Sequence, residues 1–247
     1  MFDLSGRVGL VTGGGQNVGA GIARSLAAQG AAVAINDLVE ERARVVAEEI
    51  AAQGGKAVAA AFDVSSGAAV AEGIAVAEQA LGPIDILVNN AGVPPGMGLT
   101  PFREQDPDDW TPFIDLNLYG VLHCCKAVID GMCERGFGRI VTISSGAGQV
   151  GIPLGISTYG AGKGGALSFM RHLAMEVAGQ GVTANSLALG LMASGTGDDT
   201  AAIAKTVPVG RVGFPEDIGA AVVYLASNEA AWVTGQTIGI NGGNLTS

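Results

Sequence analysis

Tyr159 and Lys163 are four residues apart, and Ser145 precedes the tyrosine in the same region of the chain. Four residues make slightly more than one helical turn, so a helix here places Tyr159 and Lys163 on one face. A lysine ammonium stabilises a nearby phenolate, and a cationic nicotinamide ring would add to that effect. Bringing a tyrosine pKa from ~10 to neutral pH requires about 3 units, or roughly 4 kcal/mol. The spacing predicts an acid–base site for hydride transfer, but Tyr-x-x-x-Lys is common on helices, so the prediction depends on the surrounding elements.

A glycine-rich turn stands near the start of the chain. The apolar run Val8 to Val11 leads directly into Thr12 to Gly19, and a helical pattern follows. Such a turn presents backbone N–H groups and a helix N-terminus to a pyrophosphate. The next apolar run ends at Asp37, about 20 residues beyond the loop, where an acid would hold an adenosine ribose. A carboxylate about 4 Å from a 2′-phosphate would cost several kcal/mol at an effective dielectric near 20, so Asp37 favours NAD over NADP.

The composition indicates a globular protein that binds small molecules. The chain has 247 residues, 48% of them hydrophobic and 15% charged, with a net charge of −10 and only 13 lysines and arginines. This acidity argues against a nucleic-acid or anionic-membrane surface. No apolar run reaches the roughly 18 residues of a membrane span, and no signal peptide precedes the first strand pattern, so we expect a cytoplasmic location.

Short apolar runs alternate with longer helical patterns throughout the chain. This alternation predicts an α/β fold, a single doubly wound Rossmann-type domain over residues 1–247 with a mainly parallel sheet and helices on both faces. Expected strands are Val8 to Val11, Ala32 to Ile35, Ala57 to Phe62, Ile84 to Val88, Arg139 to Ile143, Val182 to Leu187 and Thr237 to Ile240. Expected helices are Val18 to Gln29, Glu40 to Gln53, Ser66 to Leu81, Pro107 to Arg135, Ser157 to Gly179 and Pro215 to Ala226. Val93 to Gln105 and Leu191 to Gly210 are expected loops after strand ends, where such sheets bind ligands.

The cysteines and histidines form no pattern that predicts a metal site. Cys124, Cys125 and Cys133 lie in one expected helix without Cys-x-x-Cys spacing, and His123 and His172 have no carboxylate or cysteine constellation. We therefore expect no metal and no disulfide framework.

An ordered set of motifs along nearly the whole chain resembles the short-chain dehydrogenases/reductases of the one-domain, roughly 250-residue type. The set comprises the Thr12 to Gly19 loop, Asp63-Val64, Asn89-Asn90-Ala91-Gly92, Asn117, Ser144-Ser145, Tyr159 with Lys163, Val233 to Gln236 and Asn241-Gly242-Gly243. The resemblance implies a seven-stranded dinucleotide-binding fold and NAD(P)-dependent oxidation or reduction at a carbonyl carbon.

The resemblance also implies residue roles. Ser145 would hydrogen-bond the substrate oxygen, Tyr159 would exchange its proton, Lys163 would lower the tyrosine pKa and bind the nicotinamide ribose, and Asn117 would hold a relay water. The implied cofactor-binding residues are Gly13, Gln16, Asn17, Val18, Gly19, Asp37, Asp63, Val64, Asn89, Ala91, Gly92, Gly190, Met192 and Ser194, with Tyr159 and Lys163. Expected substrate contacts are Ser145, Ala147, Leu154, Tyr159 and Leu191. The family usually forms homotetramers through the helices that would here be Pro107 to Arg135 and Ser157 to Gly179, where Gly160, Gly162, Gly164 and Gly165 would allow close approach.

Two positions depart from the family pattern. Asn17 replaces the middle glycine of the nucleotide loop, and asparagine tolerates positive φ better than most residues. Leu189 stands where the family usually has proline, which removes a fixed φ before Gly190.

Three functions stay open at this stage. The candidate pocket residues are nearly all apolar and include no basic side chain, which favours an enzyme that interconverts a neutral, largely apolar secondary alcohol and its ketone with NAD. A 3-oxoacyl-carrier-protein reductase shares the same motifs, but Asp37 and the scarcity of basic residues weigh against it. A non-catalytic nucleotide-binding regulatory protein is the third possibility, and the four intact catalytic groups weigh against that one.

Overall fold

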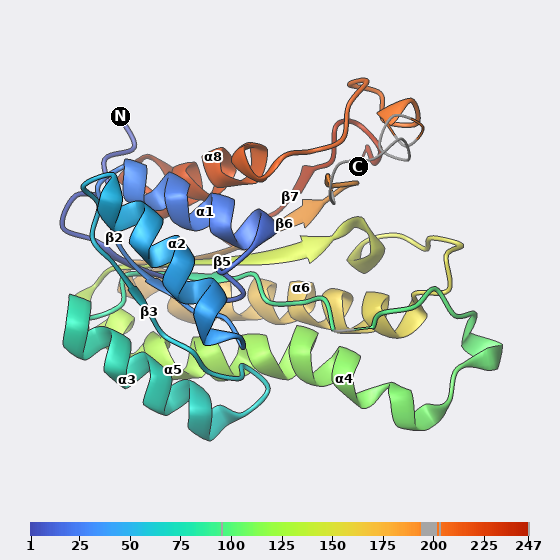
Figure 1. Cartoon of the computed structure of the whole chain (residues 1–247), viewed down its shortest axis with the longest axis horizontal. Coiled ribbons are helices and arrows are strands. Elements are labelled where there is room, and N and C mark those ends of the chain that lie inside the picture. The colour runs from blue at the N-terminus through green and yellow to red at the C-terminus, as the bar shows by residue number, and fades with distance from the viewer. Residues whose placement is uncertain (95, 194–201, 203, 247) are drawn as a thin grey trace.

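The computed structural model of the chain describes residues 1–94, 96–193, 202 and 204–246. In these residues, seven parallel strands form one sheet in the order β3-β2-β1-β4-β5-β6-β7 (Figure 1). They are β1 (Val8–Val11), β2 (Ala32–Ile35), β3 (Ala57–Ala59), β4 (Ile86–Asn89), β5 (Gly138–Ser145), β6 (Val182–Leu189) and β7 (Thr237–Ile240). The predicted doubly wound α/β fold is confirmed.

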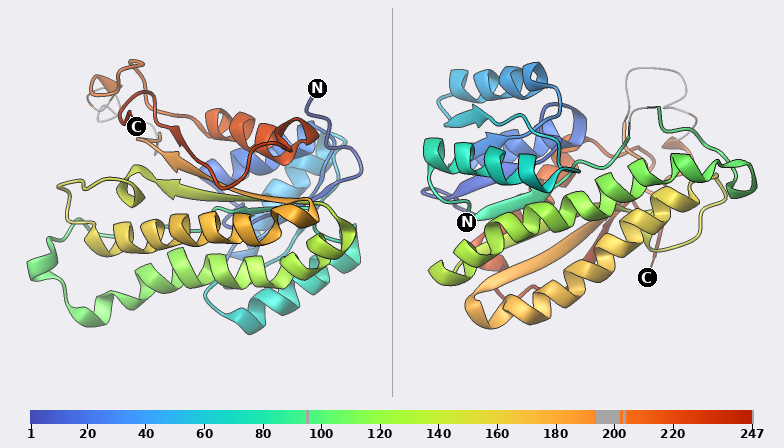
Figure 2. Two further views of the ribbon diagram at one scale, coloured as in Figure 1. Left: turned by 180° about the vertical axis from the view of Figure 1, so that it is seen from behind. Right: turned by 90° about the horizontal axis from the view of Figure 1, so that it is seen from below.

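Helices cover both faces of the sheet (Figures 1 and 2). The helices are α1 (Asn17–Ala28), α2 (Glu40–Ala52), α3 (Gly67–Leu81), α4 (Thr111–Ile114), α5 (Gly120–Arg135), α6 (Ser157–Val177) and α8 (Pro215–Ala226). The first core cluster joins α1, α2 and α8 to one face, and the second joins α3, α5 and α6 to the other. Two-sided burial explains why the strands read as continuous apolar runs rather than alternating ones.

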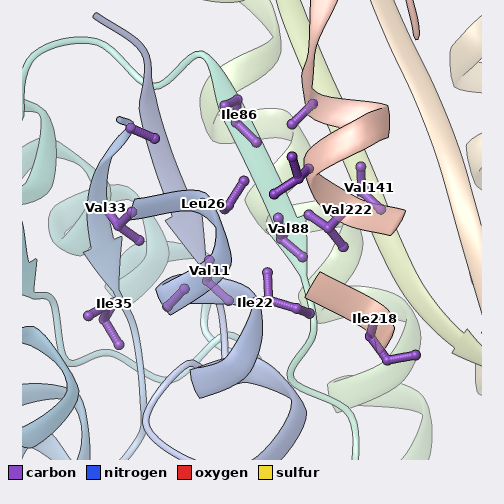
Figure 3. Packing of buried hydrophobic residues seen from close by; sticks show 14 of the residues in the cluster. Val11, Ile22, Leu26, Val33, Ile35, Ile86, Val88, Val141, Ile218 and Val222 are labelled. Carbon is purple, nitrogen blue, oxygen red and sulfur yellow. The ribbon is translucent and has the colours of Figure 1, made fainter. Parts of the chain in front are cut away.

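Aliphatic side chains fill the first of these clusters (Figure 3). Val11, Ile35 and Val88 point from the strands toward Ile22 of α1, and each is at most 1% exposed. Burying each such side chain stabilises the fold by about 1.5–3 kcal/mol. Two of the helices on this face, α1 and α8, also pack closely against each other, because Gly21 has no side chain where it meets Pro215.

The strand order reverses between β1 and β4. From β1 the chain moves outward through β2 and β3, and β4 then returns to pair with the other side of β1. In open α/β sheets, ligands bind at the carboxyl ends of the strands on either side of such a reversal, which here are β1 and β4. The motif residues that follow each strand therefore meet at one edge of the sheet.

The largest differences in extent are in one expected helix and one expected strand. The range predicted as one helix, Pro107 to Arg135, contains a 3₁₀ turn (Pro107–Asp109), the short α4, a π-helical turn (Asp115–Tyr119) and α5. The Asn117 amide donates to the carbonyl of Phe113 at 2.9 Å, so a side chain enters the helical ladder at the π turn. The third strand stops at Ala59 instead of continuing to residue 62, because the Asn36 amide takes the next carbonyls, those of Ala60 and Phe62.

Candidate functional site

The turn between β1 and α1 is closely packed and depends on its glycines. Gly13 has φ +59°, and its N–H faces the Asn36 side-chain oxygen at 3.4 Å. A side chain on Gly19 would collide with the Gly13 carbonyl, so α1 begins directly against the turn. Asn17 has φ +46°, which confirms the expected left-handed conformation at the position where the family has glycine. Gln16 is the N-cap of α1 and Val18 lies in its first turn, so the turn presents backbone N–H groups to an anion.

Asp37 lies beside this turn at the end of β2. Its carboxylate is 5% exposed and accepts hydrogen bonds from the N–H groups of Gly15 at 3.3 Å and Val39 at 3.0 Å. Arg42 also lies next to Gly15. A Cβ added to this glycine would be 2.6 Å from the Arg42 Cβ and 2.8 Å from the Asp37 Oδ2. The adenosine end of the site thus has an acid at its centre and a cation at its rim, and the sequence analysis missed the cation.

The end of β4 is tied to the glycine-rich turn by Asn90 and Thr12. The Asn90 amide donates to the carbonyls of Thr12 at 2.9 Å and Gly13 at 3.0 Å, and the Thr12 hydroxyl accepts from the N–H groups of Asn90 and Ala91. Sequence reasoning missed this role of Asn90. The expected cofactor contact Asn89 is the last residue of β4.

The Asn89 side chain points into the core. It is 3% exposed, and its amide donates to the Thr142 hydroxyl at 3.2 Å and to the Cys125 sulfur at 3.5 Å. The remaining adenine-side residues follow β3: the Asp63 carboxylate accepts from the N–H and hydroxyl of Ser65, and Val64 is buried against Gly120.

The four expected catalytic residues come from three elements, two of which, α6 and the π turn, meet next to Gly92. Ser145 ends β5, Tyr159 and Lys163 lie in α6, and Asn117 lies in the π turn. A Cβ on Gly92 would collide with the Lys163 ammonium and would be 2.8 Å from the Asn117 Oδ1, so the glycine makes room for both side chains.

Hydrogen bonds hold these side chains in place. The Lys163 ammonium donates to the Ile143 carbonyl at 2.8 Å and lies 5.8 Å from the centre of the Tyr159 ring. Ser145 hydrogen-bonds to the Tyr159 phenol and accepts from the Ala147 N–H at 3.2 Å. The buried Oδ1 of Asn117 has no hydrogen-bond partner within the chain. A buried acceptor without a partner marks a place where a water or ligand group fits.

Burial shifts both titratable groups of the site. It raises the pKa of Tyr159, and the hydrogen bond with Ser145 lowers this pKa by a smaller amount. Burial also lowers the pKa of Lys163 to about 8. The Lys163 ammonium is directed at the Ile143 carbonyl, and its lowering of the tyrosine pKa stays a prediction.

Most expected substrate contacts lie where strands end. Ala147 follows Ser145 in a 3₁₀ turn (Gly146–Gly148), and Leu154 and Leu191 are each more than 40% exposed. Gly190 and Met192 line the segment after β6, where the Gly190 N–H donates to the Ile240 carbonyl and Met192 bridges to Gly213. A cavity of about 240 Å³ lies beside Leu191, Met192 and Ile240. Ser194 and the candidate pocket residue Pro95 lie outside the described residues.

The glycines of α6 serve contacts within the chain. A Cβ on Gly160 would be 2.9 Å from the Ala147 carbonyl, one on Gly162 would be 2.9 Å from the Phe113 carbonyl, and one on Gly164 would be 3.2 Å from the Gly148 carbonyl. The small residues thus let α6 approach the segments that carry Asn117 and Ser145. They give no support for the expected contact between subunits.

Cys124 and Cys125 are interior residues of α5. Burial raises the pKa of the Cys124 and Cys125 thiols, which form no cluster with histidines or acids in the described part of the chain. In that same part no helix is both long enough and apolar enough to span a bilayer.

Taken together, the glycine-rich turn, the acid after β2 and the tyrosine–lysine pair define a dinucleotide-dependent oxidoreductase site. The chain belongs to the short-chain dehydrogenase/reductase family, whose members use a nicotinamide cofactor: residues 13–244 match the family model described as enoyl-(acyl carrier protein) reductase.

Among relatives, the chain is 43% identical to the acetoacetyl-CoA reductase of Shinella zoogloeoides, over 97% of this chain and 98% of the relative. It is 36% identical to the 3-oxoacyl-acyl-carrier-protein reductase of Escherichia coli strain K12, over 98% of both chains. Its fold is similar to the crystal structure of a gluconate 5-dehydrogenase from Burkholderia cenocepacia in complex with NADP and tartrate. The TM-score is 0.90 with 36% identity, over 98% of this chain and 96% of that one.

Proposed function

We propose that the chain interconverts a secondary alcohol and its ketone with NAD, and that the substrate is a 3-oxoacyl thioester or its 3-hydroxyacyl counterpart. The observation that carries the chemistry is the pairing of Ser145 with Tyr159, close to Lys163, which meets Asn117 at Gly92. The substrate class is supported by the relatives named for the reduction of acetoacetyl-CoA and of 3-oxoacyl chains on a carrier protein.

Each catalytic residue has one task in this proposal. Ser145 and Tyr159 hydrogen-bond the substrate oxygen, and Tyr159 donates its proton to that oxygen during ketone reduction or removes it during alcohol oxidation. Lys163 places a positive charge beside the phenolate and binds the nicotinamide ribose, and the unpartnered Asn117 Oδ1 holds a water that returns the proton. A bound nicotinamide cofactor supplies or accepts the hydride.

The expected cofactor is NAD. The Asp37 carboxylate faces the glycine-rich turn, where it would accept hydrogen bonds from ribose hydroxyls and repel a 2′-phosphate. Arg42 at the rim would offset part of that repulsion. Because Asp37 is buried and Arg42 is exposed to solvent, the repulsion by the acid should outweigh the attraction by the cation, which favours NAD over NADP.

The charges near the substrate side weigh against docking of a large acidic carrier protein. Exposed apolar side chains gather in the segments after β4 and β5, namely Val93, Leu99, Val150, Ile152 and Leu154. Arg103 is exposed there, but it lies within a stretch that also carries Glu104, Asp106, Asp108 and Asp109. This surplus of acids would repel an acidic carrier protein. The same surface also supports a second candidate, an enzyme for simple neutral secondary alcohols.

The test compares substrates and carriers in one assay. We would follow reduced-nicotinamide absorbance with acetoacetyl-CoA, the same acyl group on a carrier protein, and neutral ketones and secondary alcohols, using NAD(H) and NADP(H). Tyr159→Phe serves as the catalytic control and Tyr119→Phe, an exposed tyrosine, as the matched control. Turnover of acetoacetyl-CoA that disappears only in Tyr159→Phe supports the proposal. Turnover of neutral ketones alone would favour the second candidate, and cofactor binding without any turnover would favour a regulatory protein.

We further propose a homotetramer in the cytoplasm. Light scattering that shows a monomer at micromolar concentration would contradict the assembly.

A further inference from the structure

The end of the chain folds back over the catalytic edge of the sheet (Figure 1). After β7, Gly242 and Gly243 have φ of +61° and +90°, and the Asn244 N–H donates to the Asn241 carbonyl at 3.1 Å. These left-handed glycines turn the chain sharply, since other residues rarely adopt such φ values. The turn directs the last residues back toward β5 and β6.

Asn241 fixes the position of the returning tail. Its side-chain oxygen accepts from the Gly243 N–H at 2.9 Å, and its amide donates to the Leu245 carbonyl at 3.1 Å. Asn241 itself lies against Gly190, because a Cβ on that glycine would be 2.7 Å from the Asn241 Cα. The tail is thereby attached to the end of β6, where Gly190 follows Leu189.

The Leu245 side chain covers the main chain beside the catalytic serine. A Cβ on Gly146 would be 2.6 Å from the Leu245 Cδ1, and Leu245 is half-buried. Gly146 directly follows Ser145, and consecutive Cα atoms are about 3.8 Å apart. The leucine methyl group therefore lies against the residue that directly follows Ser145.

We propose that Leu245 forms a wall of the substrate site and limits the length of the alkyl group on the carbonyl carbon. This inference rests on the proposed function, since it assigns a contact within that site. An apolar side chain at this place suits an alkyl chain and leaves no hydrogen-bonding group unpaired. Because the tail is held by Asn241, the wall is part of the folded site rather than a loose end.

The experiment varies the wall and the substrate length together. Leu245→Ala enlarges the site, Leu245→Phe fills it, and Thr246→Ala is the matched control because Thr246 is exposed on the same tail. For each protein we would measure kcat/KM with 3-oxobutanoyl-CoA and 3-oxooctanoyl-CoA, and with 2-butanone and 2-octanone. Thermal melting and the KM for NADH report whether fold and cofactor binding are kept.

We expect Leu245→Ala to raise kcat/KM for the long substrate relative to the short one by about tenfold or more. Leu245→Phe should lower the same ratio, and Thr246→Ala should leave it unchanged. An unchanged ratio in both Leu245 variants, or an equal loss for both lengths, would overturn the inference and leave Leu245 a packing residue.

The two substrate series separate this inference from the proposed function. If the parent protein reduces the ketones but neither thioester, the thioester proposal is wrong, and the ketone pair still decides the role of Leu245. If it reduces nothing in either series, both proposals are overturned.

Discussion

Neutralising Asp37 should weaken the preference for NAD by a large and calculable factor. The carboxylate is almost fully buried and directed at the Gly15 N–H, where the adenosine ribose of a dinucleotide is expected. Two unit charges about 4 Å apart interact by about 4 kcal/mol at an effective dielectric near 20. Since about 1.4 kcal/mol corresponds to a factor of ten, Asp37→Asn should shift the ratio of kcat/KM for NADH over NADPH by a hundredfold to a thousandfold.

Asparagine is the appropriate replacement because it keeps the size of the side chain and one acceptor oxygen for the Gly15 N–H. Glu40→Gln is the matched control: Glu40 is an exposed acid at the start of α2, so its loss changes the net charge equally without changing the contact with Gly15. In the Asp37→Asn background, Arg42→Ala should weaken NADPH more than NADH, because only NADPH has a phosphate for the guanidinium to bind.

The assay is an initial-rate measurement of the parent and the three variants with both cofactors at a fixed ketone concentration. A parent protein that prefers NADPH would refute the reasoning at its first step. A ratio that changes equally in Asp37→Asn and Glu40→Gln would refute it at the second step, because the effect would then come from overall charge and not from the contact at Gly15.

Three further predictions concern the catalytic centre. Gly92→Ala should reduce turnover by about a hundredfold because its methyl group displaces the Lys163 ammonium. Gly98→Ala is the control and should keep the full rate, because the added carbon would only touch Thr100 at 3.6 Å. Ser145→Ala should move the pH midpoint of alcohol oxidation upward, because the hydrogen bond from this serine lowers the raised pKa of Tyr159; an unchanged midpoint in the pH–rate profile would contradict this. Burial lowers the Lys163 pKa from 10.5 to about 8, so between these pH values the unfolded chain binds more protons than the folded chain. The free energy of unfolding of the parent should therefore rise, relative to that of Lys163→Met, as pH increases through that window. Denaturant titrations at several pH values measure this difference.

The fold could be predicted from the sequence because its signals are local. Each strand is a short apolar run, each long helix has its own periodicity, and glycine-rich or polar segments separate them. The loop around Gly13 and the position of Asp37 were predictable for the same reason, since strand, turn, helix and acid follow one another within a few tens of residues. The left-handed Asn17 was also foreseeable from the chemistry of its side chain.

The parts that failed depend on contacts between distant segments. Nothing near Ala60 shows that the Asn36 amide will take its carbonyl and end the strand, and nothing near Gly15 shows that Arg42 will lie beside it. The glycines of α6 have a spacing that suits contact between helices of two subunits. Only the fold shows that these glycines face the chain's own catalytic segments.

The acid–base end and the substrate end of the proposed site are assembled in different ways, and this difference bears on substrate specificity. The acid–base groups stand on a strand end and a helix, so their geometry follows from regular structure. The substrate end is assembled from pairs far apart in sequence: Gly155 against Thr100, and Gly146 against Leu245. The two members of such a pair pack against each other. Exchanging one segment alone therefore removes a contact on which the other segment depends. If these segments form the substrate site as proposed, substitutions made in both members of a pair should alter substrate preference more cleanly than changes in either one.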